Sequence, residues 1–193
     1  MATAYLFTAA ISFSLKAMVG FPRPYRYFAS RLHDIYFVQG VTILDNFRLA
    51  AIRSQRKKIT IGINDSFKKK VRERIASLDM GLENKIYQPI GSLSGGQRQA
   101  LTLLMSAMDN TNVLLLDEPT AALDPKSSQV VLNLAARLNI DDGITVILVT
   151  HNLKDATQNG NRLIQMHQGK ILRDLNARAK DELLLQDIYK WFD

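Results

Sequence analysis

The sequence contains no cysteine, which excludes disulfide bonds and thiolate metal sites. Its three histidines, at positions 33, 151 and 167, are too scattered for a local zinc motif. The apolar stretch over residues 2–15 is shorter than the roughly 20 residues that a membrane-spanning helix needs. No internal repeat and no low-complexity segment occurs, so the chain is not read as a repeat array or a disordered tail.

The 193 residues that are present have an ordinary globular composition, 47% apolar and 22% charged. This length suits one domain, or one incomplete larger domain. The net charge is +7, and residues 48–74 alone hold ten lysines and arginines against two acidic residues. Such a basic stretch suits contact with nucleic acid, anionic lipid or an acidic partner, or simply forms a solvated helix face.

Apolar runs alternate with helical patterns along the chain, and this alternation predicts an α/β fold. Residues 113–116 and 145–149 are continuous apolar runs that are typical of strands buried on both faces of a parallel sheet. The periodicity predicts a helix after Ser66 with its apolar face through residue 78, and a hairpin at His167-Gln168-Gly169. Further helices are predicted over about 97–108, after Asp124-Pro125, over 153–158 and over about 179–192.

Three polar features stand where chemistry is expected in such a fold. Asp117 and Glu118 follow an apolar strand, where one carboxylate can hold Mg²⁺ and the other can deprotonate water. The glycine-rich turn around Ser94, before a helix, can bind an anion through backbone N–H groups. His151 follows the second buried strand. Taken singly, each feature also fits a purely structural role.

Together and in this order, the motifs are far more specific. They are LSGGQRQA at 93–100, VLLLDEP at 113–119, Ala122-Leu123-Asp124, and His151. Over about residues 41–175 the chain resembles the nucleotide-binding domain of ABC transporters, with the signature, Walker B, D-loop and switch histidine in place. Within that family it is similar to ATPase subunits of bacterial uptake systems for amino acids. The resemblance implies a P-loop NTPase-like ABC ATPase fold with a helical subdomain.

The resemblance also implies roles for individual residues. Asp117 would assist Mg²⁺ binding, Glu118 would polarise the attacking water, and His151 would contact the γ-phosphate. The signature residues would bind the γ-phosphate of ATP held by the opposite subunit, and Asp124 would help to couple the two subunits across their interface. The nucleotide-binding set is Ser94, Gly95, Gly96, Gln97 and Asp124, with Gln39 as the Q-loop glutamine.

The chain departs from the family pattern in one respect: it contains no G-x-x-x-x-G-K-[ST] motif. The Walker A strand and loop, which hold the phosphates, are therefore expected to be absent, as in an N-terminally truncated domain. One side of the core sheet is then either exposed or covered by residues 1–35. Residues 1–40 are interpreted as an atypical segment, 41–108 as the helical subdomain, 109–175 as the Walker B and switch core, and 176–193 as a C-terminal helix.

The function that follows is the ATP-binding and hydrolysing subunit of a transporter for a small substrate, with no ATP hydrolysis by this chain alone. ATP and Mg²⁺ are the implied cofactors. Permease subunits, a second ATPase subunit and a substrate-binding protein are the implied partners, without nucleic acid. The implied location is the cytoplasmic face of the membrane. The alternatives are a soluble ABC-type ATPase acting on nucleic acid or ribosomes, and a non-catalytic regulatory partner.

Overall fold

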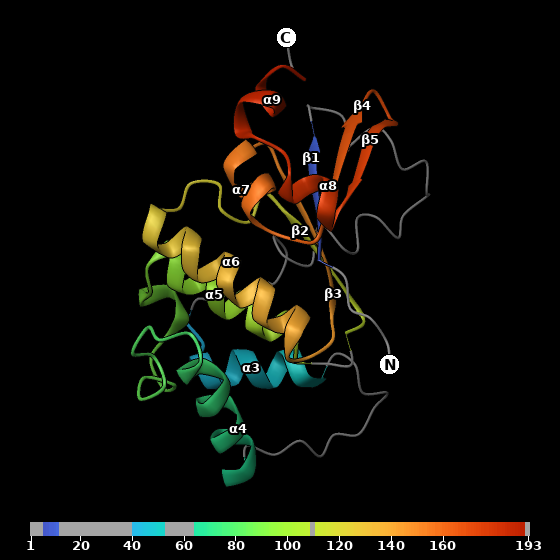
Figure 1. Ribbon diagram of the computed structural model, residues 1–193. Coiled ribbons are helices and arrows are strands. Elements are labelled where there is room, and N and C mark those ends of the chain that lie inside the picture. The colour runs from blue at the N-terminus through green and yellow to red at the C-terminus, as the bar shows by residue number, and fades with distance from the viewer. Residues whose placement is uncertain (1–5, 12–39, 53–63, 109–110, 192–193) are drawn as a thin grey trace. The chain divides into compact units, whose positions relative to one another are not determined.

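The computed structural model describes residues 6–11, 40–52, 64–108 and 111–191 (Figure 1). These residues form two compact units. The sheet unit contains the described residues of 1–30, 112–121 and 135–193, and the helical unit those of 31–111 and 122–134. Helix α6 (Pro125–Ile140) therefore contributes residues to both units.

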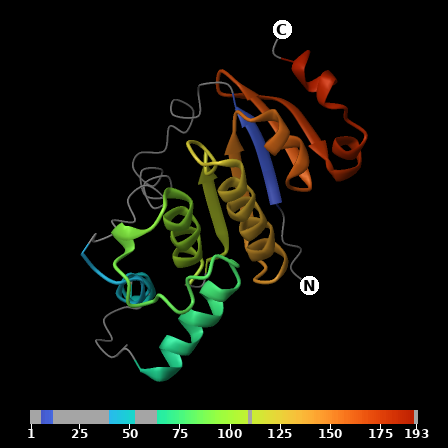
Figure 2. The ribbon, with the colours of Figure 1, turned by 90° about the vertical axis from the view of Figure 1, so that its left-hand side faces the viewer.

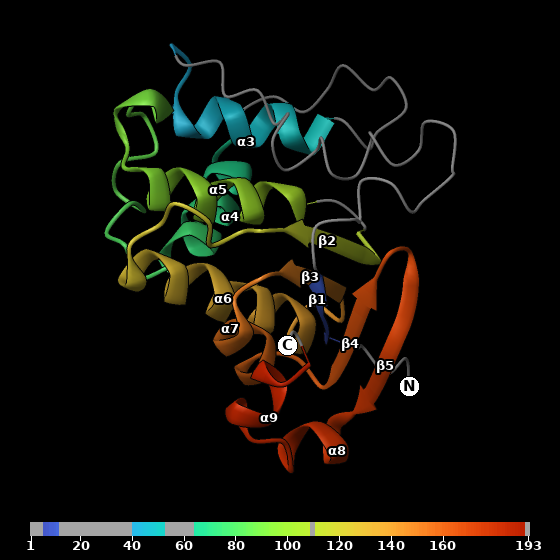
Figure 3. The same ribbon diagram turned by 90° about the horizontal axis from the view of Figure 1, so that it is seen from above.

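The sheet unit is built on five strands in the order β2-β3-β1-β4-β5. Seen from above in Figure 3, the strands follow one another in this order. The first four are parallel, and β5 runs antiparallel to β4. The strands are β1 (Leu6–Ile11), β2 (Val113–Asp117), β3 (Thr145–Thr150), β4 (Arg162–His167) and β5 (Lys170–Asn176). The expected α/β class and the expected hairpin are confirmed.

Strand β1 occupies the centre of this sheet. It pairs with β3 from Leu6 opposite Val146, and on its other edge with β4 from Phe7 opposite Arg162. Of the two outcomes expected for residues 1–35, coverage of the sheet is therefore the one observed, through residues 6–11. The β2 strand is the outermost on its side among the described strands, and Val113 is 46% exposed rather than buried on both faces.

Helices in the sheet unit begin where capping residues predict. Asn152 caps α7 (Leu153–Gln158), and its side chain accepts from two backbone N–H groups. The expected single C-terminal helix over 176–193 is wrong, because the chain forms α8 (Ala177–Asp181) and α9 (Leu185–Tyr189) instead. The break lets the Lys180 amine donate to the carbonyls of Asn159 and Gly160, and it lets Ile188 pack on Ala156 and Leu163. Burial lowers the pKa of the Lys180 amine.

The helical unit contains α3 (Ile43–Ile52), α4 (Asp65–Ala76), the short helix η1 (Ile90–Ser92), α5 (Gly95–Ser106) and the first part of α6 (Pro125–Ile140). In Figure 2, where α3 is viewed nearly end-on, α4 and α5 lie beside it. The cap of α4 is Asn64 rather than Ser66, because Asn64 accepts from the Phe67 N–H at 2.8 Å. Val71, Ile75 and Leu78 are buried as the periodicity predicts. None of the helices in the described ranges is both long and apolar enough to cross a bilayer.

Replacing Ile188 by alanine tests how the C-terminal segment is held. The side chain is 1% exposed in its cluster, so we expect the free energy of unfolding to fall by about 2–4 kcal/mol. Urea denaturation measures the loss. The control is Ile140→Ala at a side chain that is 77% exposed, which should change stability by less than about 0.5 kcal/mol. Equal losses in the two variants would contradict the packing described.

Candidate nucleotide site

The strand register brings the two expected catalytic residues together. Strands β2 and β3 are neighbours and parallel, with Asp117 opposite Val149. The next residue, Glu118, donates its backbone N–H to the Val149 carbonyl at 2.9 Å. His151 follows the last residue of β3. Because the carboxyl ends of parallel strands meet at one edge of a sheet, Glu118 and His151 lie side by side at the edge where α/β proteins bind ligands.

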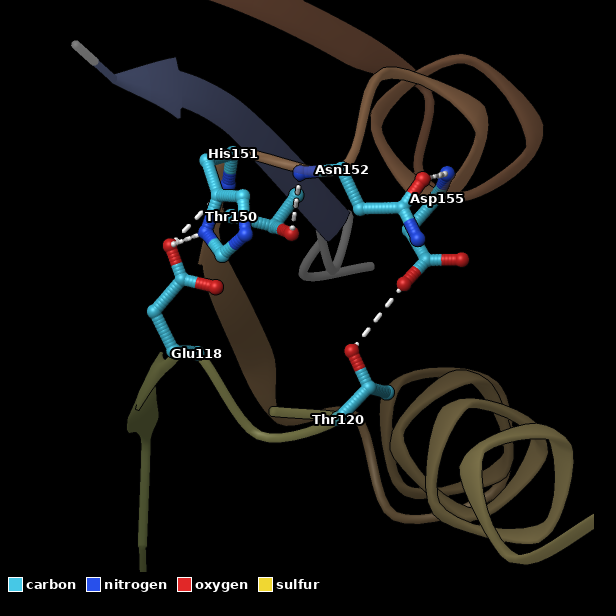
Figure 4. Close-up of polar contacts among 6 residues, drawn as sticks. All are labelled: Glu118, Thr120, Thr150, His151, Asn152 and Asp155. Atoms are coloured by element: carbon cyan, nitrogen blue, oxygen red, sulfur yellow. Dashed lines mark hydrogen bonds and ion pairs between the residues drawn. The ribbon is translucent and has the colours of Figure 1, made fainter. Parts of the chain in front are cut away.

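Glu118 and His151 make two contacts through one carboxylate oxygen (Figure 4). The backbone N–H of His151 donates to Glu118 Oε1 at 3.0 Å, and Nδ1 of the ring lies 2.7 Å from the same oxygen. A carboxylate oxygen is an acceptor, so this geometry assigns the ring proton to Nδ1 in the neutral imidazole. The His151 side chain is 75% exposed and the Glu118 side chain 32% exposed. The pair is therefore open to a ligand from solvent.

The expected signature turn forms the start of α5. Ser94 is its N-cap: the Gln97 N–H donates to Ser94 Oγ at 3.2 Å, and the Ser94 N–H donates to Gln97 Oε1 at 3.0 Å. This reciprocal pair is a capping box. The Ser94 hydroxyl accepts in this arrangement, so its own O–H is left to donate to an anion. Ser94 and Gly95 are exposed and Gly96 is buried.

The two glycines of the signature have different surroundings. The nearest atom that a Cβ on Gly95 would meet is Leu123 Cδ2, at 4.0 Å, an ordinary contact. A Cβ on Gly96 would lie 2.3 Å from Ser127 Oγ and 2.4 Å from Ser127 Cβ, closer than real side chains approach. The first turn of α5 thus packs directly on the first turn of α6. Gly96 is required at this contact by the packing alone, whatever it does toward a nucleotide.

Asp124 holds Ser127 in that position. Its carboxylate accepts from the Ser127 N–H at 3.0 Å and from the Ser127 hydroxyl at 2.6 Å, as expected for an N-cap followed by Pro125. These two hydrogen bonds hold the pKa of the Asp124 carboxyl below its ordinary value. Through Ser127, the expected D-loop aspartate and the signature helix form one packed arrangement. Gln39, the expected Q-loop glutamine, lies outside the described residues.

Comparison with known proteins shows what the chain as a whole is similar to. The ABC transporter family model matches residues 30–121. A tyrosine transport ATP-binding protein of Clostridioides difficile is 39% identical over 149 residues, which make up 72% of this chain and 59% of that protein. In sequence and in fold, the chain is similar to ATP-binding proteins of the ABC transporter family.

Two further relatives match the chain over comparable lengths. The phosphonates import ATP-binding protein PhnC of Escherichia coli K12 is 28% identical over 167 residues, 83% of this chain and 64% of PhnC. The dimeric structure of a bacterial ABC transporter cassette matches with a TM-score of 0.61 and 28% identity, over 75% of this chain and 60% of the cassette. The chain spans about six tenths of the length of these relatives.

The carboxylates at the end of β2 fit Mg²⁺ only as part of a larger ligand set. Asp117 ends β2 and is exposed, so its carboxylate can reach a metal ion from solvent. The described residues contain no cluster of three or more metal-ligating side chains. Magnesium commonly takes one or two protein carboxylates and completes its shell with water and substrate phosphate oxygens. Asp117 suits that mode of binding and does not form a metal cage by itself.

The side chains that hold the site in place by hydrogen bonds were not predicted from the sequence. Thr120 donates through Oγ1 to Asp155 Oδ2 at 3.0 Å across 35 residues, and the Asn152 N–H donates to Thr150 Oγ1 at 3.0 Å. Asn152 could have been recognised, because an asparagine before a helical pattern is a typical N-cap. The pairing of Thr120 with Asp155 has no local signal. Ser127 was missed in the same way, because its contact with Gly96 joins two helices.

Substitutions at the two signature glycines should separate packing from ligand contact. We expect Gly96→Ala to lower the free energy of unfolding by about 1–3 kcal/mol, because the added methyl meets Ser127. Gly95→Ala is the matched control and should cause no loss, since alanine is favoured over glycine in a helix. Denaturant unfolding of both variants measures the difference.

A second substitution tests the cause of the Gly96 effect. Ser127→Gly removes both atoms that the new methyl would meet. The Gly96→Ala/Ser127→Gly double variant should therefore cost less than the sum of the two single changes. Strict additivity of the two losses, or a loss in Gly95→Ala as large as in Gly96→Ala, would show that the contact with Ser127 is not the cause.

Proposed function

We propose that the chain is an ATP-binding subunit of an ABC transporter that powers the movement of a small substrate, in the manner of bacterial amino-acid uptake systems. The observation that carries the proposal is the meeting of Glu118 and His151 beside Asp117 at the carboxyl edge of the sheet. The signature helix α5 supports it. So do the relatives, whose names describe ATP-binding proteins for tyrosine transport and phosphonate import.

In this proposal each polar group has a defined task. The Glu118 carboxylate orients and polarises the attacking water, and Nε2 of His151 is the ring nitrogen that contacts the γ-phosphate of ATP. Asp117 helps to hold Mg²⁺, which neutralises charge on the phosphate oxygens when bound. The arrangement at the ends of β2 and β3 supplies these side chains, but each task also requires ATP to be held at this edge of the sheet.

The second part of the proposal concerns the signature. The chain contains no G-x-x-x-x-G-K-[ST] motif, so it does not supply the phosphate-binding loop and lysine for ATP in its own site. The N-terminus of α5, with Ser94 and Gly95 exposed, presents backbone N–H groups and a hydroxyl to an anion. We propose that Ser94, Gly95, Gly96 and Gln97 act on ATP held by a second ATPase subunit, with Asp124 at the same interface.

The proposed partners are the permease subunits and, for an importer, a substrate-binding protein, at the cytoplasmic face of the membrane. Helix α4 supplies the basic surface for this contact. Its apolar side chains Val71 and Ile75 are buried, while Lys69 and Lys70 are exposed. Lys68 pairs with Asp65 at 3.1 Å, and Lys69 makes a longer contact of 3.9 Å with the exposed Glu73. Lys69 and Lys70 are exposed whereas Lys68 is half-buried, so these two form the part of this surface best suited to a partner. Acidic permease loops and anionic headgroups both suit such a charge.

ATPase turnover in mixtures with an intact homologous subunit tests the proposed division of labour. The purified chain alone should show no measurable hydrolysis, because it lacks the phosphate cradle. In the mixture, Gly95→Asp should abolish the activity that this chain restores, since it places a carboxylate where phosphate binds. Glu118→Gln should leave that activity within about twofold of the wild type, because Glu118 belongs to the site without a cradle.

The control for Gly95→Asp is Gly95→Ala, which keeps the helix start and adds no charge. If Glu118→Gln stops turnover and Gly95→Asp does not, this chain holds nucleotide in a working site of its own. The proposed dependence on a partner subunit is then wrong. Hydrolysis by the chain alone that is lost in Glu118→Gln leads to the same conclusion.

Charge reversal on α4 tests the partner surface. We expect Lys69→Glu/Lys70→Glu to weaken flotation with vesicles of anionic lipid that carry a homologous permease, by about tenfold in affinity at low salt. The fold should be unchanged, because exposed charges contribute little to stability. Lys170→Glu, an exposed change on β5, is the control. A salt-sensitive RNA shift that the α4 variant loses, with vesicle binding intact, would favour the nucleic-acid alternative.

A further inference from the structure

The turn after β2 is held at two points, and only one of them lies at the candidate site. The first is the contact of Glu118 with His151. The second is the hydrogen bond from Thr120 Oγ1 to Asp155 Oδ2 at 3.0 Å, which is half-buried and joins this turn to α7 (Figure 4). Neither Thr120 nor Asp155 has a task in the chemistry proposed above.

The turn needs support because Glu118 is strained. Its φ is +48°, in the left-handed region that residues other than glycine rarely adopt. The Ala121 N–H closes the turn by donating to the Glu118 carbonyl at 3.1 Å. Such a conformation persists only where the surrounding structure over-determines it. Besides Glu118 itself, Thr120 has a side chain in this turn that is hydrogen-bonded to another segment, the helix α7.

The partner of Thr120 is itself fixed. The Asn152 side chain accepts from the Lys154 N–H at 3.0 Å and from the Asp155 N–H at 3.2 Å, which sets the first turn of α7. The Asn152 N–H donates to Thr150 Oγ1 at the end of β3. The turn between β3 and α7 is therefore held by hydrogen bonds on both sides. It carries His151, and the Asp155 carboxylate extends from the helix that follows it. Figure 4 shows the two contacts side by side, Glu118 with His151 and Thr120 with Asp155.

We infer that Thr120 and Asp155 are positioning residues for the Glu118–His151 pair. Their hydrogen bond holds the strained turn against α7, so that Glu118 Oε1 meets both donors of His151. The consequence is a fixed imidazole tautomer, with the proton on Nδ1 and the lone pair on Nε2. The purpose of that ring orientation rests on the proposed function, because it turns Nε2 away from Glu118 and toward nucleotide. A hydrogen bond from Nε2 to an anionic phosphate oxygen then requires a proton on Nε2, while the proton on Nδ1 stays hydrogen-bonded to Glu118. The positioning of Glu118 against His151 by the Thr120–Asp155 hydrogen bond does not depend on bound nucleotide.

The tautomer of His151 can be read directly from the full chain without ATP. Long-range nitrogen–proton NMR spectra distinguish the two ring nitrogens, and His151→Gln identifies the signals among the three histidines. Thr120→Val keeps the side-chain shape and removes the hydroxyl. We expect the ratio of Nδ1–H to Nε2–H forms to fall by about two- to tenfold, the range that the loss of one net hydrogen bond allows.

Two controls separate positioning from general stability. Thr120→Ser keeps a hydroxyl and should restore the wild-type ratio. Thr157→Val removes a hydroxyl of α7 that donates to Leu153 and Lys154 within that helix, and it should leave the ratio unchanged. An unchanged ratio in folded Thr120→Val, or an equal shift in Thr157→Val, overturns the inference.

A second variant keeps the test open if Thr120→Val does not fold. Asp155→Ala removes the acceptor, so its shift in the ratio should match that of Thr120→Val. The double variant should shift the ratio no further, because both changes remove the same bond. Additive shifts overturn the inference. If the ratio responds as expected but mixtures with an intact subunit show no restored ATPase activity, the proposed function fails while the positioning role stands.

Discussion

The register between β2 and β3 is the constraint on which the rest of the site depends. Both strands are parallel, and the bond from the Glu118 N–H to the Val149 carbonyl continues their ladder one residue beyond β2. A slip of one residue would turn the Glu118 side chain to the other face of the sheet, because side chains alternate along a strand. The carboxylate and His151 would then no longer meet. The backbone pairing of β2 with β3 therefore determines whether the Glu118 and His151 side chains can meet.

After Glu118 the chain turns sharply out of the sheet, and the backbone conformation of this turn costs free energy. Glu118 and Ala122 both have positive φ angles, and each such residue costs about 1–3 kcal/mol. A single hydrogen bond contributes only about 0.5–1.5 kcal/mol net. One bond is thus too weak to fix the turn alone. Three together, from the Glu118 N–H, the Ala121 N–H and the Thr120 hydroxyl, are of the right size to offset the strain at Glu118.

Features with a local cause were predictable from the sequence. The strands at 113–117 and 145–150 and the helix at 153–158 follow from apolar runs and caps that lie within a few residues. The adjacency of Glu118 and His151 followed from the rule that ligands gather at the carboxyl ends of parallel strands. Contacts between distant segments were not predictable, such as Thr120 with Asp155 and Gly96 with Ser127. The break between α8 and α9 belongs to the second kind, because tertiary packing of Ile188 overrides a continuous helical pattern.

The central strand β1 shows that forming the sheet and binding phosphate place different demands on the sequence. Pairing with β3 and β4 uses the backbone of residues 6–11, and almost any apolar sequence satisfies it. Binding phosphate needs particular residues after such a strand, glycines for close approach and a lysine for charge. No G-x-x-x-x-G-K-[ST] motif follows Ile11, and the Gly-Lys pair of the sequence, Gly169-Lys170, lies far along the chain at the turn into β5 and is followed by Ile171. The pairing of β1 within the described sheet therefore does not imply a complete nucleotide site, and the activity must be argued from the side chains at the edge of the sheet.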